Sequence, residues 1–308
     1  MKRFVWVALL VLSLGLVSAC GGGGAQQPAG QSGGEQKTTT IGLAISTLNN
    51  PFFVDLRDGA QAAADAAGFK LVVLDAQDDP SAQVSQIEDL ITQKVDVILI
   101  NPTDSDAVVP AVEQANQAGI PVITVDRSSN GGKVVTHIAS DNVAGGKMAG
   151  EYLLELIGKK GNIVELEGVP GASATRDRGE GFHQAVDGVA DVKVVAKQTA
   201  NFNRNEGLEV MENILQANPD IVGVFAHNDE MALGALEAIT AAGKADQIKV
   251  VGFDATDDAV AAVKEGRMAG TIAQKPKEMG KLAVEAAQKV IAGQSVDEFI
   301  PVPLELVK

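Results

Sequence analysis

The sequence predicts an α/β protein of two similar lobes, each built on a doubly wound parallel sheet. Short apolar runs rich in β-branched residues alternate with Ala-rich amphipathic stretches from Thr40 onward. Apolar runs of this kind, separated by helices, are typical of parallel sheets that are covered on both faces. The chain has 308 residues, which suggests about two domains, and its candidate strands are too many for one comfortable open sheet.

The candidate strands form two series that meet near Ala139–Asn142. The strands of the first series are Ile41–Ser46, Leu71–Asp75, Asp96–Ile100, Pro121–Asp126 and Val134–Ala139. The strands of the second series are Asn162–Gly168, Val192–Lys197, Ile221–Ala226, Ile248–Asp254 and Met268–Gln274. Helical patterns lie between them, and the first of these, residues 51–67, begins with Pro51 directly after Asn50. Asn before Pro is a favourable pair for a helix start.

The N-terminal segment is expected to be a leader and a tether that lie outside the fold. Lys2 and Arg3 precede an apolar run over 4–17 that is too short to span a bilayer comfortably. The run ends in "VSAC", which resembles the lipobox of bacterial lipoproteins and contains Cys20, the only cysteine. This implies a lipoprotein signal peptide over 1–19, then a lipidated Cys20 and a flexible tether over 20–37, rich in Gly, Ser and Gln. An ordinary signal peptide that leaves a free thiol is the alternative.

The leader predicts an extracytoplasmic protein, exported and lipid-anchored to a membrane surface in the periplasm or at the cell surface.

Forty acidic residues against 25 basic ones give a net charge of −15, and no Lys/Arg-rich run occurs. Nucleic acid is therefore not expected as a partner. The chain has no P-loop and no set of Cys and His at metal-ligand spacing, so no cofactor and no metal are expected.

Aromatic and charged residues gather at the predicted carboxyl ends of the strands, where open parallel sheets bind ligands. Aromatic rings occur there beside carboxylates, guanidinium groups and amides, although the chain has only nine Phe and one Tyr. This mixture suits a monosaccharide, because the C–H face of a sugar packs on Phe while each hydroxyl both donates and accepts hydrogen bonds. The candidate residues are Asn50, Phe52, Phe53, Asp126, Arg127, Arg176, Arg178, Phe202, Asn228, Phe253, Asp254 and Gln274.

Each candidate also has a purely structural explanation. Asn50, Asn228 and Asp254 all precede helical patterns, where a short polar side chain serves as an N-cap. Phe53 falls on the apolar stripe of the 51–67 helix, whereas Phe52 lies off that stripe and is the better ligand candidate. The charged candidates can form surface ion pairs, which contribute little to stability. The convergence of at least seven of them on one edge of the sheets favours a binding site.

Several segments of the chain resemble the ribose-binding members of the type I periplasmic binding protein family. They are "STLNNPFF", "INPTDSDAV", "GIPVITVDR", "HIASDN", "RDRGEGF", "NDEMALGAL" and "VVGFD", and the likeness runs from about Thr40 to Lys308. It implies aromatic residues around the sugar ring and polar contacts from both lobes. The implied aromatic residues are Phe52, Phe53, Phe202 and Phe253. The implied polar residues are Ser46, Asn50, Asp126 and Arg127 in the first lobe, Arg178, Asn228 and Asp254 in the second, and Gln274 at the crossing.

The same resemblance implies a hinge of three crossover strands. These would pass near Ser140-Asp141, Gln274-Lys275 and Val302–Leu304. The first lobe would then comprise 38–140 plus 275–303, and the second lobe 141–274 plus 304–308. One departure from the family pattern is His227, which stands where close relatives carry Gln.

The function that follows from the resemblance is that of an extracytoplasmic substrate-binding lipoprotein. It would capture D-ribose between two lobes by hinge closure and pass the sugar to the membrane permease of an ABC importer, as a monomer without enzymatic activity. Another small sugar, allose or a furanose signalling sugar, is the alternative ligand. Glucose and galactose are less favoured, because the only tryptophan, Trp6, lies in the leader and no calcium-binding loop is present.

Two other classes of protein share parts of this pattern. A regulator of the lactose-repressor type would need an N-terminal helix-turn-helix with a basic face, where this chain has a leader and a tether. A glycosidase would need an acid/base pair of carboxylates, for which Asp126 and Asp254 are the candidates. Neighbouring arginines are expected to keep both carboxylates ionised, which makes either one a poor general acid.

Overall fold

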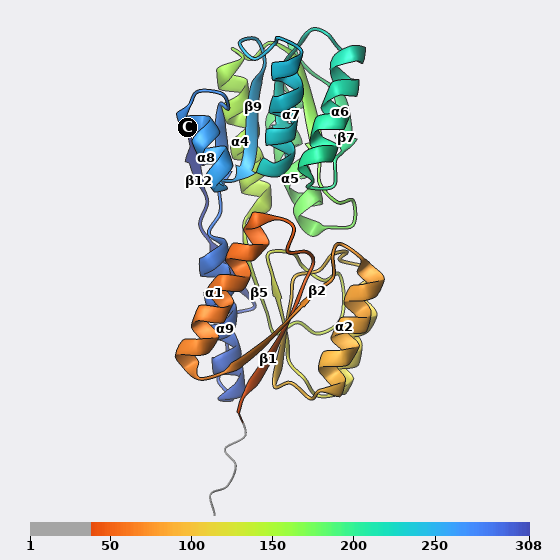
Figure 1. Cartoon of the computed structure of the whole chain (residues 1–308), viewed down its shortest axis with the longest axis vertical. Helices are drawn as coiled ribbons and strands as arrows, with labels where there is room; N and C mark the ends of the chain where they lie inside the picture. Colours follow the sequence, from red (N-terminus) through yellow and green to blue (C-terminus); the bar gives the residue numbers. More distant parts are fainter. Residues whose placement is uncertain (1–37) are drawn as a thin grey trace, which may run out of the picture. The chain divides into compact units, whose positions relative to one another are not determined.

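The computed structural model describes residues 38–308, and within them the chain forms two α/β lobes, each built on a six-stranded sheet (Figure 1). This confirms the predicted fold class. All of the strands predicted from the sequence are present at nearly the expected bounds. The predicted leader, Cys20 and the tether lie outside the described residues. None of the helices over 38–308 combines the length and the apolar character needed to cross a bilayer.

The first lobe is a parallel sheet with helices on both faces. Its strands lie in the order β11-β5-β4-β3-β1-β2, and every neighbouring pair is parallel. Because side chains alternate along a strand, Leu43 of β1 packs under α1 and α9, whereas Ala44 packs on the face that α2 and α3 cover. The elements are β1 (Thr40–Ile45), α1 (Pro51–Ala67), β2 (Lys70–Asp75), α2 (Pro80–Thr92), β3 (Val97–Ile100), α3 (Val109–Gln117), β4 (Val122–Val125), β5 (Thr136–Ser140), α9 (Pro276–Ile291) and β11 (Phe299–Val302).

The second lobe repeats this arrangement with the strand order β12-β10-β9-β8-β6-β7. One face of its sheet packs against α6, α7 and α8, and the other against α4 and α5, so this sheet is also covered on both sides. The elements are α4 (Asn142–Leu156), β6 (Gly161–Glu167), α5 (Ser173–Val186), β7 (Val192–Thr199), α6 (Arg204–Ala217), β8 (Ile221–Ala226), α7 (Asp229–Ala241), β9 (Lys249–Asp254), α8 (Asp257–Lys264), β10 (Gly270–Ala273) and β12 (Glu305–Val307).

The chain passes between the two lobes three times, after β5, after β10 and after β11. The short strands β11 and β12 were not among the strands predicted from the apolar pattern. β12 pairs with β10 in the antiparallel sense, unlike every other strand of its sheet. The reason is the direction of travel: β10 leads out of the second lobe toward α9, whereas β12 leads back in from β11.

Helix α1 shows how the sequence places aromatic rings at a strand end. The side-chain oxygen of Asn50 accepts a hydrogen bond of 2.9 Å from the Phe52 amide, and Pro51 occupies the first helical turn. The helix ends at Gly68, whose φ of 71° is the left-handed conformation that glycine adopts easily. The first turn therefore fixes Phe52 and Phe53 just beyond the carboxyl end of β1.

Candidate functional site

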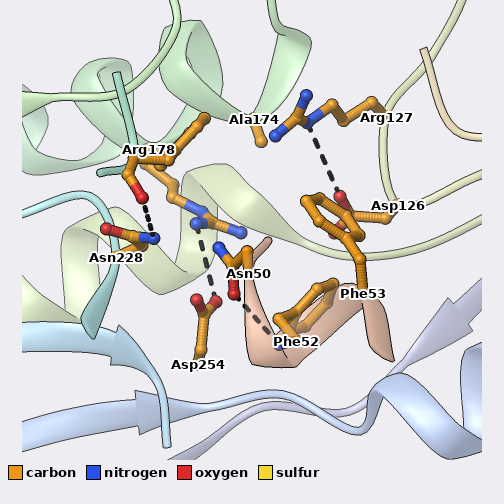
Figure 2. A pocket seen from close by; sticks show the side chains of 10 residues that line it. Asn50, Phe52, Phe53, Asp126, Arg127, Ala174, Arg178, Asn228 and Asp254 are labelled. Atoms are coloured by element: carbon orange, nitrogen blue, oxygen red, sulfur yellow. Dashed lines mark hydrogen bonds and ion pairs between the residues drawn. The ribbon is translucent and has the colours of Figure 1, made fainter. Parts of the chain in front are cut away.

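A narrow cavity lies between residues of the two lobes (Figure 2). Aromatic, charged and amide side chains line it, and those that were predicted from the sequence come from strand ends and helix starts in both lobes. The lining residues are Asn50, Phe52, Phe53, Asp126, Arg127, Ala174, Arg178, Phe202, Asn228 and Asp254. None of them is more than 9% exposed, so the site is almost closed to solvent.

Nine of the twelve residues that the sequence predicted for the ligand site line this cavity. Ser46, Phe253 and Gln274 do not, and each contacts a residue that does or a neighbour of one. Ser46 Oγ donates to Asn101 Oδ1 at 2.7 Å, and Gln274 Nε2 donates to Asp254 Oδ1 at 2.8 Å. The Phe253 ring lies beneath the guanidinium group of Arg178.

Ala174 is the lining residue that sequence reasoning missed. Its methyl group carries no chemistry that a sequence pattern could single out, and it reaches the cavity only because it stands in the first turn of α5. Arg176, another early candidate, is half exposed and pairs with Asp177 at 2.9 Å. Arg176 therefore forms the surface ion pair that was its alternative explanation.

The aromatic residues form two walls with an arginine between them. The rings of Phe52 and Phe53 meet edge to face, with centroids 5.2 Å apart and planes at 88°. The Arg127 guanidinium carbon lies 5.0 Å from the Phe53 centroid and 5.1 Å from the Phe202 centroid. Phe53 and Phe202 come from different lobes, so Arg127 joins the two walls through cation–π contacts.

Arg178 is held in place entirely by residues of the second lobe. Its Nε donates to Asn142 Oδ1 at 2.8 Å, and its Nη1 donates to the backbone oxygen of His227 at 2.6 Å. Its guanidinium carbon lies 3.9 Å from the centroid of the Phe253 ring. Nη1 also lies 3.7 Å from Asp254 Oδ1, which is a loose ion pair (Figure 2). Arg178 is thus oriented before any ligand arrives.

Asp126 has one carboxylate oxygen that contacts the protein and one that does not. Oδ2 accepts from Asn101 Nδ2 at 3.3 Å and lies 3.8 Å from Arg127 Nε. Oδ1 is buried and has no hydrogen-bond partner. A buried polar atom without a partner is costly and points to a missing ligand group or water.

Burial raises the pKa of both Asp126 and Asp254, although arginines act in the opposite direction on each. This differs from the expectation that neighbouring arginines would hold these carboxylates firmly ionised. The ion pairs are long, at 3.8 Å and 3.7 Å. Burial also lowers the pKa of Arg127, which shows that desolvation dominates in this site.

Non-glycine residues with positive φ cluster around the cavity. Such backbone conformations are costly and occur where the surrounding structure enforces them, often at functional sites. Here they turn the chain at the ends of β4, β7 and β9, so that the following side chains face the cavity. The residues and angles are Asp126 at 64°, Asn201 at 49°, Phe202 at 58°, Asp254 at 119° and Ala255 at 58°.

Two hydrogen bonds join the lobes directly beside the cavity. The Ser105 amide of the first lobe donates to the Gly171 carbonyl of the second at 2.9 Å. The Ser128 amide donates to Ser173 Oγ, also at 2.9 Å. The lobes are therefore in contact, and the cavity is enclosed between them.

Comparisons with known proteins give a consistent result. Residues 41–295 match the family model described as "Periplasmic binding protein domain". The chain is 53% identical over 306 residues to the ribose import binding protein RbsB of Bacillus subtilis strain 168, covering 99% of both chains. It is 55% identical over 268 residues to RbsB of Salmonella typhimurium strain LT2, covering 87% of this chain and 90% of that one.

A solved structure has a similar fold as well as a similar sequence. It is an ABC transporter periplasmic solute binding protein from Actinobacillus succinogenes 130z with bound D-allose. The two superpose with a TM-score of 0.82 at 37% identity, over 88% of this chain and 97% of the other.

Proposed function

Because the chain belongs to the periplasmic binding protein family, we propose that it captures D-ribose between its lobes for an ABC-type importer. The observation that carries the proposal is the unpartnered, buried Oδ1 of Asp126, a residue that lines the cavity together with three phenylalanines. A sugar hydroxyl supplies the proton that this oxygen lacks. Among the small sugars, ribose is supported by the similarity of the chain to ribose import binding proteins.

The side chains that line the cavity match the apolar and polar parts of a monosaccharide. The rings of Phe52, Phe53 and Phe202 offer apolar surface to the C–H faces of the sugar. Arg127 and Arg178 have only donors, so they bind the oxygens of the sugar, whereas the carboxylates accept from its hydroxyls. An analogue that lacks one hydroxyl leaves a buried charged group without a partner and is rejected strongly.

We infer a capture mechanism in which the three passages between the lobes act as the hinge. The hinge lies near Ser140-Asp141, Gln274-Lys275 and Val302–Leu304, and divides the chain into 38–140 plus 275–303 and 141–274 plus 304–308. Only the closed form lets both lobes contact the sugar at once, so the sugar shifts the open–closed equilibrium toward closure. The closed protein then presents the sugar to its permease. Lipid on Cys20 and the tether over 20–37 hold the binding protein near the membrane.

D-allose is the second candidate ligand. The observation that favours it is the bound D-allose of the solute binding protein from Actinobacillus succinogenes, at 37% identity. The identities of 53% and 55% to ribose import binding proteins favour ribose over it.

Calorimetric titration with a panel of sugars tests the proposal. Residues 38–308, which hold both sheets and their apolar cores, are unfolded and refolded first to remove any retained sugar. D-ribose, D-allose, D-xylose, D-galactose and D-glucose are then titrated separately. We expect ribose to bind with a Kd of about 1 μM or lower, corresponding to roughly −8 kcal/mol. Binding of allose alone selects the second candidate, and the absence of binding to every sugar contradicts the proposed function.

A further inference from the structure

We propose that Asp229 is a positioning residue of the sugar site, which holds the backbone turn that presents Asp254 to the cavity. The inference rests on the proposed function, because Asp254 is one of the proposed sugar contacts. Asp229 itself does not line the cavity, and it is completely buried behind it.

The turn after β9 has a backbone that does not hold its shape by itself. Asp254 has a φ of 119° and Ala255 a φ of 58°, and neither residue is glycine. L-residues rarely adopt such angles, and they persist only where surrounding contacts enforce them. The contacts that act on the next two amides, those of Ala255 and Thr256, therefore decide where the Asp254 side chain points.

Both of these amides are connected to the carboxylate of Asp229. Its Oδ2 accepts from the Thr256 amide at 2.8 Å and from the Thr256 hydroxyl at 3.3 Å. Its Oδ1 accepts from the Thr271 hydroxyl at 2.7 Å, and that hydroxyl oxygen accepts from the Ala255 amide at 3.2 Å. One carboxylate thus fixes two successive peptide units, one directly and one through Thr271.

The surrounding sequence makes room for this carboxylate. Asp229 is the first residue of α7 and follows the N-cap Asn228, which lines the cavity. Gly252 of β9 lies opposite Thr271 of β10, and a Cβ on Gly252 would collide with Asp229 Oδ1. The segment "ND" therefore has two tasks: Asn228 faces the cavity, and Asp229 supports the turn behind it.

Asp254 depends on this support because its other contacts are few. Gln274 Nε2 donates to its Oδ1 at 2.8 Å, and the Arg178 ion pair is long at 3.7 Å. A turn that relaxes toward ordinary backbone angles would rotate the Asp254 carboxylate away from Arg178 and from the cavity. An acid in the first turn of a helix also stabilises that helix in a general way, so the test must separate positioning from general stability.

Sugar affinity in a double-mutant cycle separates the two roles. The ligand is whichever sugar of the panel binds the unaltered protein most tightly, and the variants are Asp229→Asn, Asp254→Asn and both together. If Asp229 acts through Asp254, each single change weakens binding by about 10-fold or more and the double change by little beyond the larger single effect. Effects that multiply, or an unchanged affinity in Asp229→Asn, would overturn the proposal.

Two Thr→Val variants provide a second route and a matched control. Thr271→Val removes the hydroxyl that links Asp229 to the Ala255 amide, so its affinity should fall in the same direction. Thr136 is equally buried in β5, and its hydroxyl has no hydrogen-bond partner, so Thr136→Val should bind sugar within about 2-fold of the unaltered protein. Equal effects of the two variants would show that the loss of a buried hydroxyl explains the result and would overturn the proposal.

Amide hydrogen exchange tests the positioning without any ligand. In the unliganded Asp229→Asn protein, the amides of Ala255 and Thr256 should exchange about 10-fold faster or more, while those of the first lobe stay unchanged. Unchanged exchange at both amides would overturn the proposal even if a sugar binds. If no sugar of the panel binds, the proposed function fails, whereas this measurement still decides whether Asp229 holds the turn.

Discussion

Replacing Asp126 with asparagine should weaken sugar binding and, at the same time, stabilise the unliganded protein. The two effects have one cause, since Asp126 Oδ1 is buried without a hydrogen-bond partner, and in the proposed complex a sugar hydroxyl donates to it. Asparagine has the same shape but no charge, and its amide oxygen can still accept from Asn101, as Asp126 Oδ2 does at 3.3 Å. The substitution therefore changes the electrostatics of the site and leaves its packing intact.

The size of the affinity loss follows from the number of bonds involved. In the proposed complex the single unpartnered oxygen accepts one sugar hydroxyl, and a hydrogen bond to a charged group contributes about 1.5–3 kcal/mol. The Kd should therefore rise by about 10- to 150-fold. The stability change has the opposite sign, because burial raises the pKa of Asp126 and its ionised form destabilises the empty site. Each 1 kcal/mol gained should raise the Tm by ~2–4 °C.

Calorimetric titration and thermal unfolding without sugar measure the two effects on the same samples. Asp79→Asn is the matched control, because Asp79 caps α2 away from the cavity and asparagine is an equally good N-cap. The control should change neither the Kd nor the Tm appreciably. A Kd for Asp126→Asn within about 3-fold of the unaltered protein would refute the assignment of Oδ1 as a sugar acceptor, and a lowered Tm would refute the electrostatic argument.

Two further predictions concern closure and pH. A Cβ at Gly171 would collide with the Asp104 carboxylate of the other lobe. Gly171→Ala should therefore oppose closure and weaken sugar binding about 5-fold or more. The radius of gyration of the liganded variant, measured by X-ray scattering, should be larger than that of the unaltered protein. Burial raises the pKa of Asp229 to about 7, so the folded protein holds a proton that the unfolded chain releases near pH 4. We compare the free energy of unfolding of the unaltered protein with that of the Asp229→Asn variant. The difference, unaltered protein minus variant, should fall by roughly 4 kcal/mol at most between pH 4 and 7 and stay level above pH 7. Urea unfolding across this range measures the difference, and a difference that rises with pH would contradict the reasoning.

The fold was largely predictable because its strands are continuously apolar and bounded by turns. The strands that sequence reasoning missed, β11 and β12, are short and lie on either side of Pro303, with Pro301 inside β11. Proline removes a backbone donor and so weakens the strand pattern, although it is tolerated on a sheet edge. β11 and β12 are indeed the edge strands of their sheets.

The candidate site was predictable where side-chain chemistry and strand ends coincide, as for Asp126 and Arg127. Phe253 is a residue for which the prediction of cavity lining was wrong. It directly precedes Asp254 on β9, but only Asp254 lines the cavity. Phe253 instead packs in the core between the sheet and α4. The role of Asp229 was also invisible, because it depends on Thr256 and Thr271, which only the folded chain brings together.

The way the chain returns to the first lobe has a consequence for biosynthesis. A ribosome makes β1 to β5 first, but the α9 helix that covers their sheet and the edge strand β11 come from residues 276–302. Met279 and Ala283 of α9 share an apolar core with Leu43 of β1. The first lobe therefore cannot finish folding until nearly the whole polypeptide has been translated, whereas almost all of the second lobe is complete by residue 273. The nascent chain therefore carries an incomplete first lobe through most of its synthesis.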